Sequence, residues 1–231
     1  IQTVRQSVAF RRPTASEIRY EMYSALAFGF KQLSFFTWFT PVNRNEPFED
    51  GIIGSNGVPN AHYEDIKTIN REILTIGPIL AKCDALEVYL NGTTWGQPGI
   101  PKDFFVQPGG KNQKYTVSFL RHKETGRNYL MLVNNNFGKR ATVNLKLDPS
   151  ITALYEVSRE NGGYIPLEIA DNSLELQLAA GDGVLLALPE GLDFYKPATG
   201  QPDAQVNLAA DALITCSQSL GASGCYMMYL N

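Results

Sequence analysis

Two stretches in the first third of the chain carry the helical period of apolar positions. The first opens with a Thr-Ala-Ser-Glu capping box, in which Thr14 and Glu17 satisfy each other's backbone N–H groups. Gly29 ends this predicted helix as a C-cap. A second helix is predicted over about residues 62–80, where apolar positions step by three and four. Its apolar stripe consists of Ile66, Ile69, Ile73, Ile76 and Leu80.

The segments before and between these helices have the character of strands. Residues 1–6 contain several β-branched side chains and indicate the end of a strand. Residues 31–39 (KQLSFFTWF) are largely apolar and aromatic without alternation, which is typical of a strand covered on both faces in a parallel sheet. The loop over residues 41–60 follows. Because long loops of parallel α/β units lie at the carboxyl ends of strands, this loop is where a ligand site is first expected.

In residues 85–195 the apolar positions no longer follow the helical period and instead recur at every second residue, as in β-strands. Short apolar runs alternate with Gly, Asn, Asp and Pro, and the pairs Gly162-Gly163 and Gly181/Gly183 mark tight turns. This pattern predicts an antiparallel β-sandwich. The expected strands are Leu86–Leu90, Tyr115–Leu120, Tyr129–Asn134, Ala141–Leu147, Ala153–Val157, Leu174–Leu178 and Val184–Leu188.

The predicted fold class is therefore α/β plus all-β. Residues 1–82 form the α/β part and residues 85–195 the sandwich, while residues 197–231 contain a linker and what reads as the opening of another β domain. The three cysteines are Cys83, placed in the second helical stretch, and Cys216 and Cys225 in the tail. Two of them pair in an oxidising compartment, or all three remain free thiols; their spacing indicates no metal site.

Composition narrows the classes of partner. With a net charge of -3 and only 19% charged residues, the chain has no basic field to attract nucleic acid or an anionic membrane. No apolar run reaches the roughly 18 to 20 residues that a membrane span requires. Nucleotide-binding, serine-hydrolase and zinc-protease motifs are absent from the sequence, and no cofactor is expected. A neutral ligand fits these features best.

The stretches RRPTASEIRYEMYSALAFGFKQLSFFTWFTP and YEDIKTINREILTIGPIL resemble the last two βα units of clan-A-type glycoside hydrolases and their uncharacterised bacterial relatives. This resemblance implies that residues 1–82 are the C-terminal portion of a TIM barrel, a (β/α)₈ fold. Residues 1–4 are then the end of its seventh strand and residues 31–39 its eighth. The resemblance covers about a third of the chain.

The following domain, with KYTVSFLRHKETGRNYLMLVNNN and LAAGDGVLLAL, resembles the β-sandwich that trails the barrel in many of these enzymes. The tail NLAADALITCSQS is similar to the start of discoidin-like carbohydrate-binding modules. Together these resemblances imply a secreted or periplasmic bacterial glycoside hydrolase that acts on a poly- or oligosaccharide. The chain is then a fragment that starts inside the barrel and ends inside the module. Its expected partners are the carbohydrate substrate and the missing N-terminal part of the barrel.

The resemblance implies a catalytic carboxylate after the seventh strand, and the sequence has none there. Glycoside hydrolysis normally needs two carboxyl groups flanking the bond, and in the resembled enzymes these follow the fourth and seventh strands. Residues 1–13 contain no Asp or Glu, so no catalytic residue is assigned and the chain alone is expected to be inactive. Glu17 and Glu21 have helix-capping and surface roles. In the loop over residues 41–60, acids are available at Glu46, Glu49 and Asp50.

Substrate binding is expected from five residues. In the resembled enzymes an aromatic residue at the carboxyl end of the eighth strand forms the floor under the sugar, a role that falls on Trp38 unless it is simply barrel core. Hydrogen bonds to hydroxyl groups are expected from Gln2 and Arg5 at the seventh strand and from Asn43 and Arg44 in the loop.

Two other readings stay open. The chain is a non-catalytic carbohydrate-binding or scaffold protein, for which Trp95 in a Gly/Pro-rich stretch is a candidate sugar platform. Alternatively it is a complete small protein whose α/β portion pairs with a second copy. His62, at the start of the second helix, and His122, in the sandwich, are interpreted as structural or surface residues.

Overall fold

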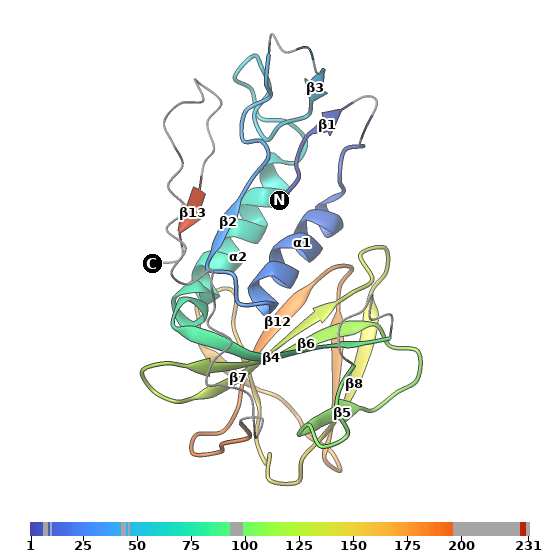
Figure 1. Ribbon diagram of the computed structural model, residues 1–231, viewed down its shortest axis with the longest axis vertical. Coiled ribbons are helices and arrows are strands. Elements are labelled where there is room, and N and C mark those ends of the chain that lie inside the picture. The colour runs from blue at the N-terminus through green and yellow to red at the C-terminus, as the bar shows by residue number, and fades with distance from the viewer. Residues whose placement is uncertain are drawn as a thin grey trace, which may run out of the picture.

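The computed structural model describes a chain of mixed α and β structure with several antiparallel sheets (Figure 1). Two helices lie on one face of a six-stranded sheet, and a three-stranded sheet covers its other face. The described part of the chain comprises residues 1–6, 9, 11–42, 45, 47–92, 99–195 and 227–229.

Helix α1 (Ala15–Ala27) begins and ends as predicted. Thr14 is its N-cap, and the capping box with Glu17 is formed in both directions. At the other end Gly29 has a φ of 85°, which a residue without a Cβ adopts readily. The N–H groups of Gly29 and Phe30 donate to the carbonyls of Leu26 and Ala25, which is the Schellman arrangement. The prediction of this helix is confirmed.

Helix α2 (Tyr63–Ala81) is also confirmed, and the whole predicted isoleucine stripe is buried. Strand β4 (Cys83–Asn91) begins immediately after it, with only the C-cap Lys82 between them. The placement of Cys83 in the helical stretch was therefore wrong. Its side chain is fully buried beneath α2, and this burial raises the pKa of the thiol to about 12.

All seven predicted strands are present, with small differences at their ends. Two three-residue strands, β5 and β10, were not predicted, because three residues show no periodicity. Every pair of neighbours in both sheets is antiparallel. In spatial order the larger sheet consists of β10 (Tyr164–Pro166), β9 (Tyr155–Val157), β12 (Gly183–Ala187), β7 (Asn128–Asn134), β6 (Tyr115–His122) and β4, and the smaller of β11 (Ser173–Leu178), β8 (Ala141–Leu147) and β5 (Val106–Pro108).

The central strands β6, β7 and β12 are buried on both faces, so their side chains contribute to two hydrophobic cores. On one face, Met131 and Leu185 pack against the helices. On the other face, Leu132 and Leu186 pack against the smaller sheet. Because the helices cover a sheet formed by residues after 82, the α/β part and the antiparallel part share a core rather than each having its own.

Residues 1–4 lie beside residues 34–37, with α1 in the chain between them. Gln2 and Phe36 form a parallel bridge, in which Thr3 N–H donates to Phe36 O at 2.8 Å and Phe36 N–H to Ile1 O at 2.8 Å. Within the described residues, parallel pairing is limited to this bridge and one between Phe39 and Ile53. The strand expected over residues 31–39 is continuous only as β2 (Gln32–Ser34). The closing part of a TIM barrel therefore stays a prediction.

Three further short strands complete the fold. β1 (Arg5–Gln6) pairs antiparallel with β3 (Phe48–Glu49), which joins the loop after β2 to the first segment of the chain. β13 (Met227–Tyr229) pairs antiparallel with β2. A stretch of the predicted tail thus returns to the α/β part, next to α2 in Figure 1. Neither described helix is long and apolar enough to cross a membrane.

Charged residues join the helices to the larger sheet in a seam cluster formed by Arg19, Tyr23, Glu72, Arg159 and Asp182. Arg19 Nη1 lies 2.5 Å from Glu72 and 3.0 Å from Asp182, and Arg159 Nη1 lies 2.7 Å from Asp182. Tyr23 donates its hydroxyl hydrogen to Glu72 at 3.0 Å. Burial alone would raise the pKa of Glu72, but the arginines hold it below its usual value, so this acid stays charged.

Candidate functional site

The described residues that best fit a binding site lie where residues 1–6, residues 34–37 and the loop before α2 meet. We call this group the edge site. It is at the end of the molecule remote from the two large sheets, around β1 and β3 in Figure 1. Its residues are Gln2, Arg5, Phe36, Phe48, Glu49 and Asp50.

Aromatic rings form one half of the edge site. Phe36 lies opposite Gln2 in the parallel bridge and is 51% exposed. Its ring meets the Phe48 ring edge to face, with centroids 5.5 Å apart and an interplanar angle of 81°. Phe48 is held in place because β3 pairs with β1. An exposed ring braced by a second ring is a preformed apolar platform.

Charged side chains form the other half. Arg5 faces Glu49 across the β1 and β3 pair and forms an ion pair with it, and Arg5 Nε also lies 3.7 Å from Asp50 Oδ2. The side chains of Arg5 and Glu49 are 47% and 49% exposed. Such solvated pairs contribute little to stability, so their hydrogen-bonding groups can be shared with a ligand at small cost.

The loop that carries Asp50 is anchored by hydrogen bonds to its own backbone. Thr40 Oγ1 donates to Ile53 O at 2.9 Å and accepts from the N–H of Gly51 at 3.0 Å. Asn60 Nδ2 donates to Gly51 O at 2.6 Å. Asp50 itself has a φ of 60°, a conformation that aspartate tolerates better than most residues. These contacts fix the position of the carboxylate next to Arg5.

Of the five residues predicted to bind substrate, Arg5 and Gln2 lie in the edge site. Gln2 is largely engaged within the chain: its side-chain Nε2 donates to the carbonyls of Val4 and Arg11, both at 3.1 Å. Its backbone N–H donates to Glu21 Oε2 at 3.1 Å, so Glu21 has a structural role. Asn43 and Arg44 are outside the described residues, as are Glu46, Trp95, Cys216 and Cys225.

Trp38 points toward α2 and stands apart from the edge site. Its ring is half-buried and packs edge to face against Tyr63, with centroids 6.5 Å apart. It lines a cavity of about 310 Å³ together with Tyr63, Ile52, Ile66, Lys67, Asn70, Arg71 and Leu74. In residues 36–38 the more exposed aromatic is Phe36, which the sequence reasoning did not single out. The run SFFTWF contains four aromatic residues and no periodicity that tells them apart.

His62 lies behind the loop as the N-cap residue of α2 and is only 4% exposed. Burial lowers the pKa of its imidazole, the positive charge of Arg12 acts in the same direction, and the negative charge of Asp50 opposes them. The ring is therefore neutral at neutral pH. Its Nε2 has no hydrogen-bond partner among the described residues.

No group of three or more His, Cys, Asp or Glu side chains in the described part of the chain could hold a metal ion. The edge site thus offers aromatic surface, one guanidinium and two carboxylates for binding. The chain matches no family model, and a search of curated proteins finds no significant relative.

Proposed function

We propose that this chain recognises a neutral oligosaccharide at the edge site, as part of a secreted bacterial glycoside hydrolase. The observation that carries the proposal is the half-exposed ring of Phe36 beside the solvated ion pair of Arg5 and Glu49. The face of an aromatic ring can cover the apolar face of a pyranose. The guanidinium donates to sugar hydroxyls and the carboxylates accept from them, so the two halves of the site fit the two kinds of surface on one sugar.

The enzyme class rests on resemblance and is supported by topology. Residues 1–4 and 34–37 lie side by side in parallel with α1 in the chain between them, as consecutive strands of a βα unit do. Within the edge site, Arg5 follows residues 1–4, and Glu49 and Asp50 belong to the loop after residues 34–37. These charged residues thus come after the carboxyl ends of the two segments, where barrel enzymes bind their ligands. The two antiparallel sheets after residue 82 share one core, as the layers of a β-sandwich do.

Recognition without cleavage is proposed for the chain itself. Hydrolysis needs two carboxyl groups on either side of the scissile bond, roughly 5 to 9.5 Å apart. Glu49 and Asp50 are adjacent in the chain and both pair with Arg5. Both carboxylates therefore lie beside the same guanidinium and are not placed on opposite sides of a gap that could hold a glycosidic bond. Purified chain should release no product from aryl-glycosides. Such release would contradict the assignment.

A binding experiment tests the proposal. The full chain is titrated calorimetrically with neutral tetrasaccharides of glucose, xylose, mannose and galactose. Phe36→Ala should weaken the best interaction about fivefold, since one aromatic contact contributes about 1 kcal/mol. Arg5→Gln should weaken it by a smaller factor.

Phe30→Ala is the matched control, because Phe30 is a phenylalanine of similar exposure, 58% against 51% for Phe36, and lies just after the C-terminal end of α1. It should leave the affinity unchanged. If no neutral saccharide binds, or if Phe30→Ala and Phe36→Ala weaken binding equally, the edge site is not a sugar site. If the whole protein to which this chain is proposed to belong binds saccharides but hydrolyses none, a non-catalytic carbohydrate-binding protein would be favoured over an enzyme.

A further inference from the structure

A second polar cavity lies on the antiparallel part of the chain. Two adjoining hollows of about 340 and 730 Å³ share Arg127, Tyr164, Pro189 and Glu190 in their walls. Their size is within the range of small-molecule sites. The larger hollow reaches Ile79, near the end of α2, whereas the edge site lies near the beginning of that helix. We call the pair the tyrosine cavity.

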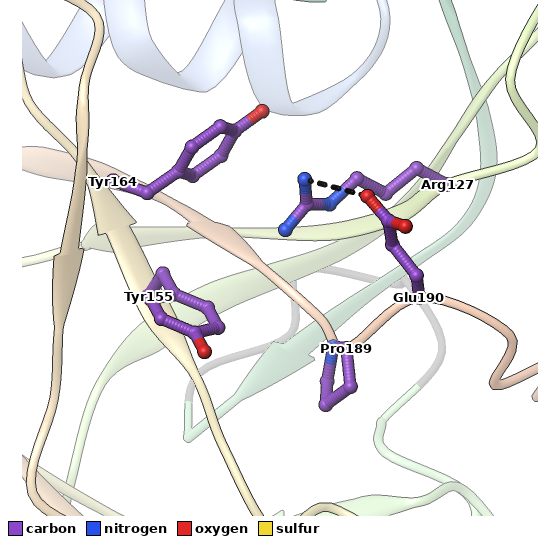
Figure 2. A pocket seen from close by; sticks show the side chains of 5 residues that line it. All are labelled: Arg127, Tyr155, Tyr164, Pro189 and Glu190. Atoms are coloured by element: carbon purple, nitrogen blue, oxygen red, sulfur yellow. Dashed lines mark hydrogen bonds and ion pairs between the residues drawn. The ribbon is translucent and has the colours of Figure 1, made fainter.

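The guanidinium of Arg127 is the centre of the tyrosine cavity. It stacks on the Tyr164 ring at 4.4 Å from the ring centroid and lies 5.9 Å from that of Tyr129. Figure 2 shows it facing the cavity opposite the Tyr155 ring. The stacking fixes the plane of the guanidinium, and a hydrogen bond between the hydroxyls of Tyr129 and Tyr164 at 3.1 Å fixes the ring beneath it.

The hydrogen-bonding capacity of Arg127 is poorly used within the chain. Its Nη1 reaches Glu190 Oε1 at 3.4 Å, a long contact to a carboxylate whose side chain is 81% exposed. Its Nε is buried and has no hydrogen-bond partner among the described residues. By contrast, the neighbouring Arg121 is firmly paired with Asp193 at 2.6 Å. The chain thus leaves part of the donor capacity of Arg127 unused. The side chain is still 17% exposed and lines both hollows, so a ligand in the cavity can reach it.

An apolar wall faces this guanidinium. The ring of Tyr155 lies across the cavity and meets Tyr164 edge to face, with centroids 6.4 Å apart and an interplanar angle of 78°. Pro189 closes the floor between Tyr155 and Glu190. One side of the cavity therefore suits the apolar face of a sugar ring, and the other suits an anion.

We propose that the tyrosine cavity binds a uronic acid residue of an acidic saccharide. The carboxylate pairs with Arg127 and displaces Glu190, and the pyranose ring lies against Tyr155. A planar guanidinium with a fixed orientation presents parallel N–H donors that match the two oxygens of a carboxylate. This site is separate from the edge site and does not depend on it.

Titration of the full chain with the tetrasaccharide of galacturonic acid and with its neutral methyl ester tests the proposal. The acid should bind at least about tenfold more tightly than the ester, since the charged hydrogen bond to Arg127 is absent from the ester. Arg127→Gln should remove this preference, and Tyr155→Ala should weaken both ligands. Arg140→Gln is the matched control, because Arg140 is an exposed arginine that directly precedes β8 of the smaller sheet and lines neither hollow. It should change nothing.

Glu190→Gln keeps the test decisive if Arg127→Gln does not fold, because Glu190 is a surface residue. Removal of this competing carboxylate should tighten the binding of the acid severalfold. Equal affinity for acid and ester, absence of binding, or unchanged binding in Arg127→Gln and Glu190→Gln would overturn the proposal. Equally tight binding of a sulfated tetrasaccharide or of a glutamate-rich peptide would also overturn it, since the site would then not select a sugar carboxylate.

Discussion

The seam cluster and the edge site use the same chemistry in opposite surroundings. In the seam cluster, Arg19 and Arg159 converge on Asp182, whose side chain is 9% exposed. In the edge site, Arg5 pairs with Glu49 and both side chains are about half exposed. The charges of the seam cluster are largely withdrawn from water, so the loss of one charge leaves its partners without full compensation. The charges of the edge site remain in water, and water and salt screen their interaction. The first therefore holds the fold together, and the second is free to act on a ligand.

The largest effect should come from Asp182→Ala. The substitution removes one of the two carboxylates that Arg19 and Arg159 share at the junction of helices and sheet, and leaves only Glu72 to balance two arginines. We expect a loss of about 3 kcal/mol of unfolding free energy, as found when one partner is removed from a buried ion pair. Urea denaturation of the full chain measures it. Glu64→Ala, at an exposed acid on α2, is the control and should change stability by less than about 0.5 kcal/mol. Similar losses for both variants would refute the special role of the seam cluster.

Gly183→Ala tests how closely the helices approach the sheet at the same junction. A Cβ at this position would overlap the ring of Tyr23, which is fully buried. We expect a loss of about 2 kcal/mol, typical of overpacking a core. Gly126→Ala is a weaker change, since the space around Gly126 is open and only its φ of 70° opposes a side chain. If Gly183→Ala is tolerated without loss, the helices do not pack on β12 as described.

The capping box gives a pH-dependent effect of intermediate size. The hydrogen bond from Arg11 lowers the pKa of Glu17 to about 2. Because the folded pKa is below the unfolded value of about 4.3, Glu17 stabilises the fold above that pH, and the contribution is lost as pH falls toward 2. Arg11 is largely exposed, so about 0.5 to 1 kcal/mol is expected. Thermal unfolding of wild type and Glu17→Gln between pH 2 and 6 measures the difference. A difference that is independent of pH would exclude this ion pair as its cause.

The smallest effect on stability should follow substitution in the edge site. Arg5→Gln removes a solvated ion pair, so the unfolding free energy should change by less than about 0.5 kcal/mol. The same denaturation experiment as for Asp182→Ala gives the comparison directly. A loss of 2 kcal/mol or more would mean that Arg5 is part of the structural framework.

Elements with a long, regular pattern could be predicted from the sequence. The Thr14 cap, the isoleucine stripe of α2 and the seven strands expected in residues 85–195 each carry a local signal that tertiary packing did not override. Strands β1, β3 and β13 have only two or three residues, and their pairings join distant segments. Nothing local specifies such pairs.

The edge site shows why a candidate site is harder to predict than a fold. Arg5 was expected at a strand end beside a sugar, and it does lie next to two of the loop acids that the sequence had suggested. Trp38 was expected to lie under the sugar because it falls at the carboxyl end of the expected eighth strand, where the resembled enzymes carry an aromatic floor, and Phe36 was not among the candidates. Which ring of residues 36–38 faces α2 depends on the packing of Tyr63, a contact between segments that sequence spacing does not report.

The most direct test of the proposed role of the edge site is to map saccharide binding residue by residue. Backbone amide resonances of the full chain are followed by NMR during titration with the neutral tetrasaccharide that binds most tightly. We predict shifts concentrated at Gln2, Arg5, Phe36 and residues 48–50, and a titration midpoint at a severalfold higher saccharide concentration in Phe36→Ala. Shifts confined to the Trp38 and Tyr63 cavity, or a midpoint that Phe36→Ala leaves unchanged, would contradict it.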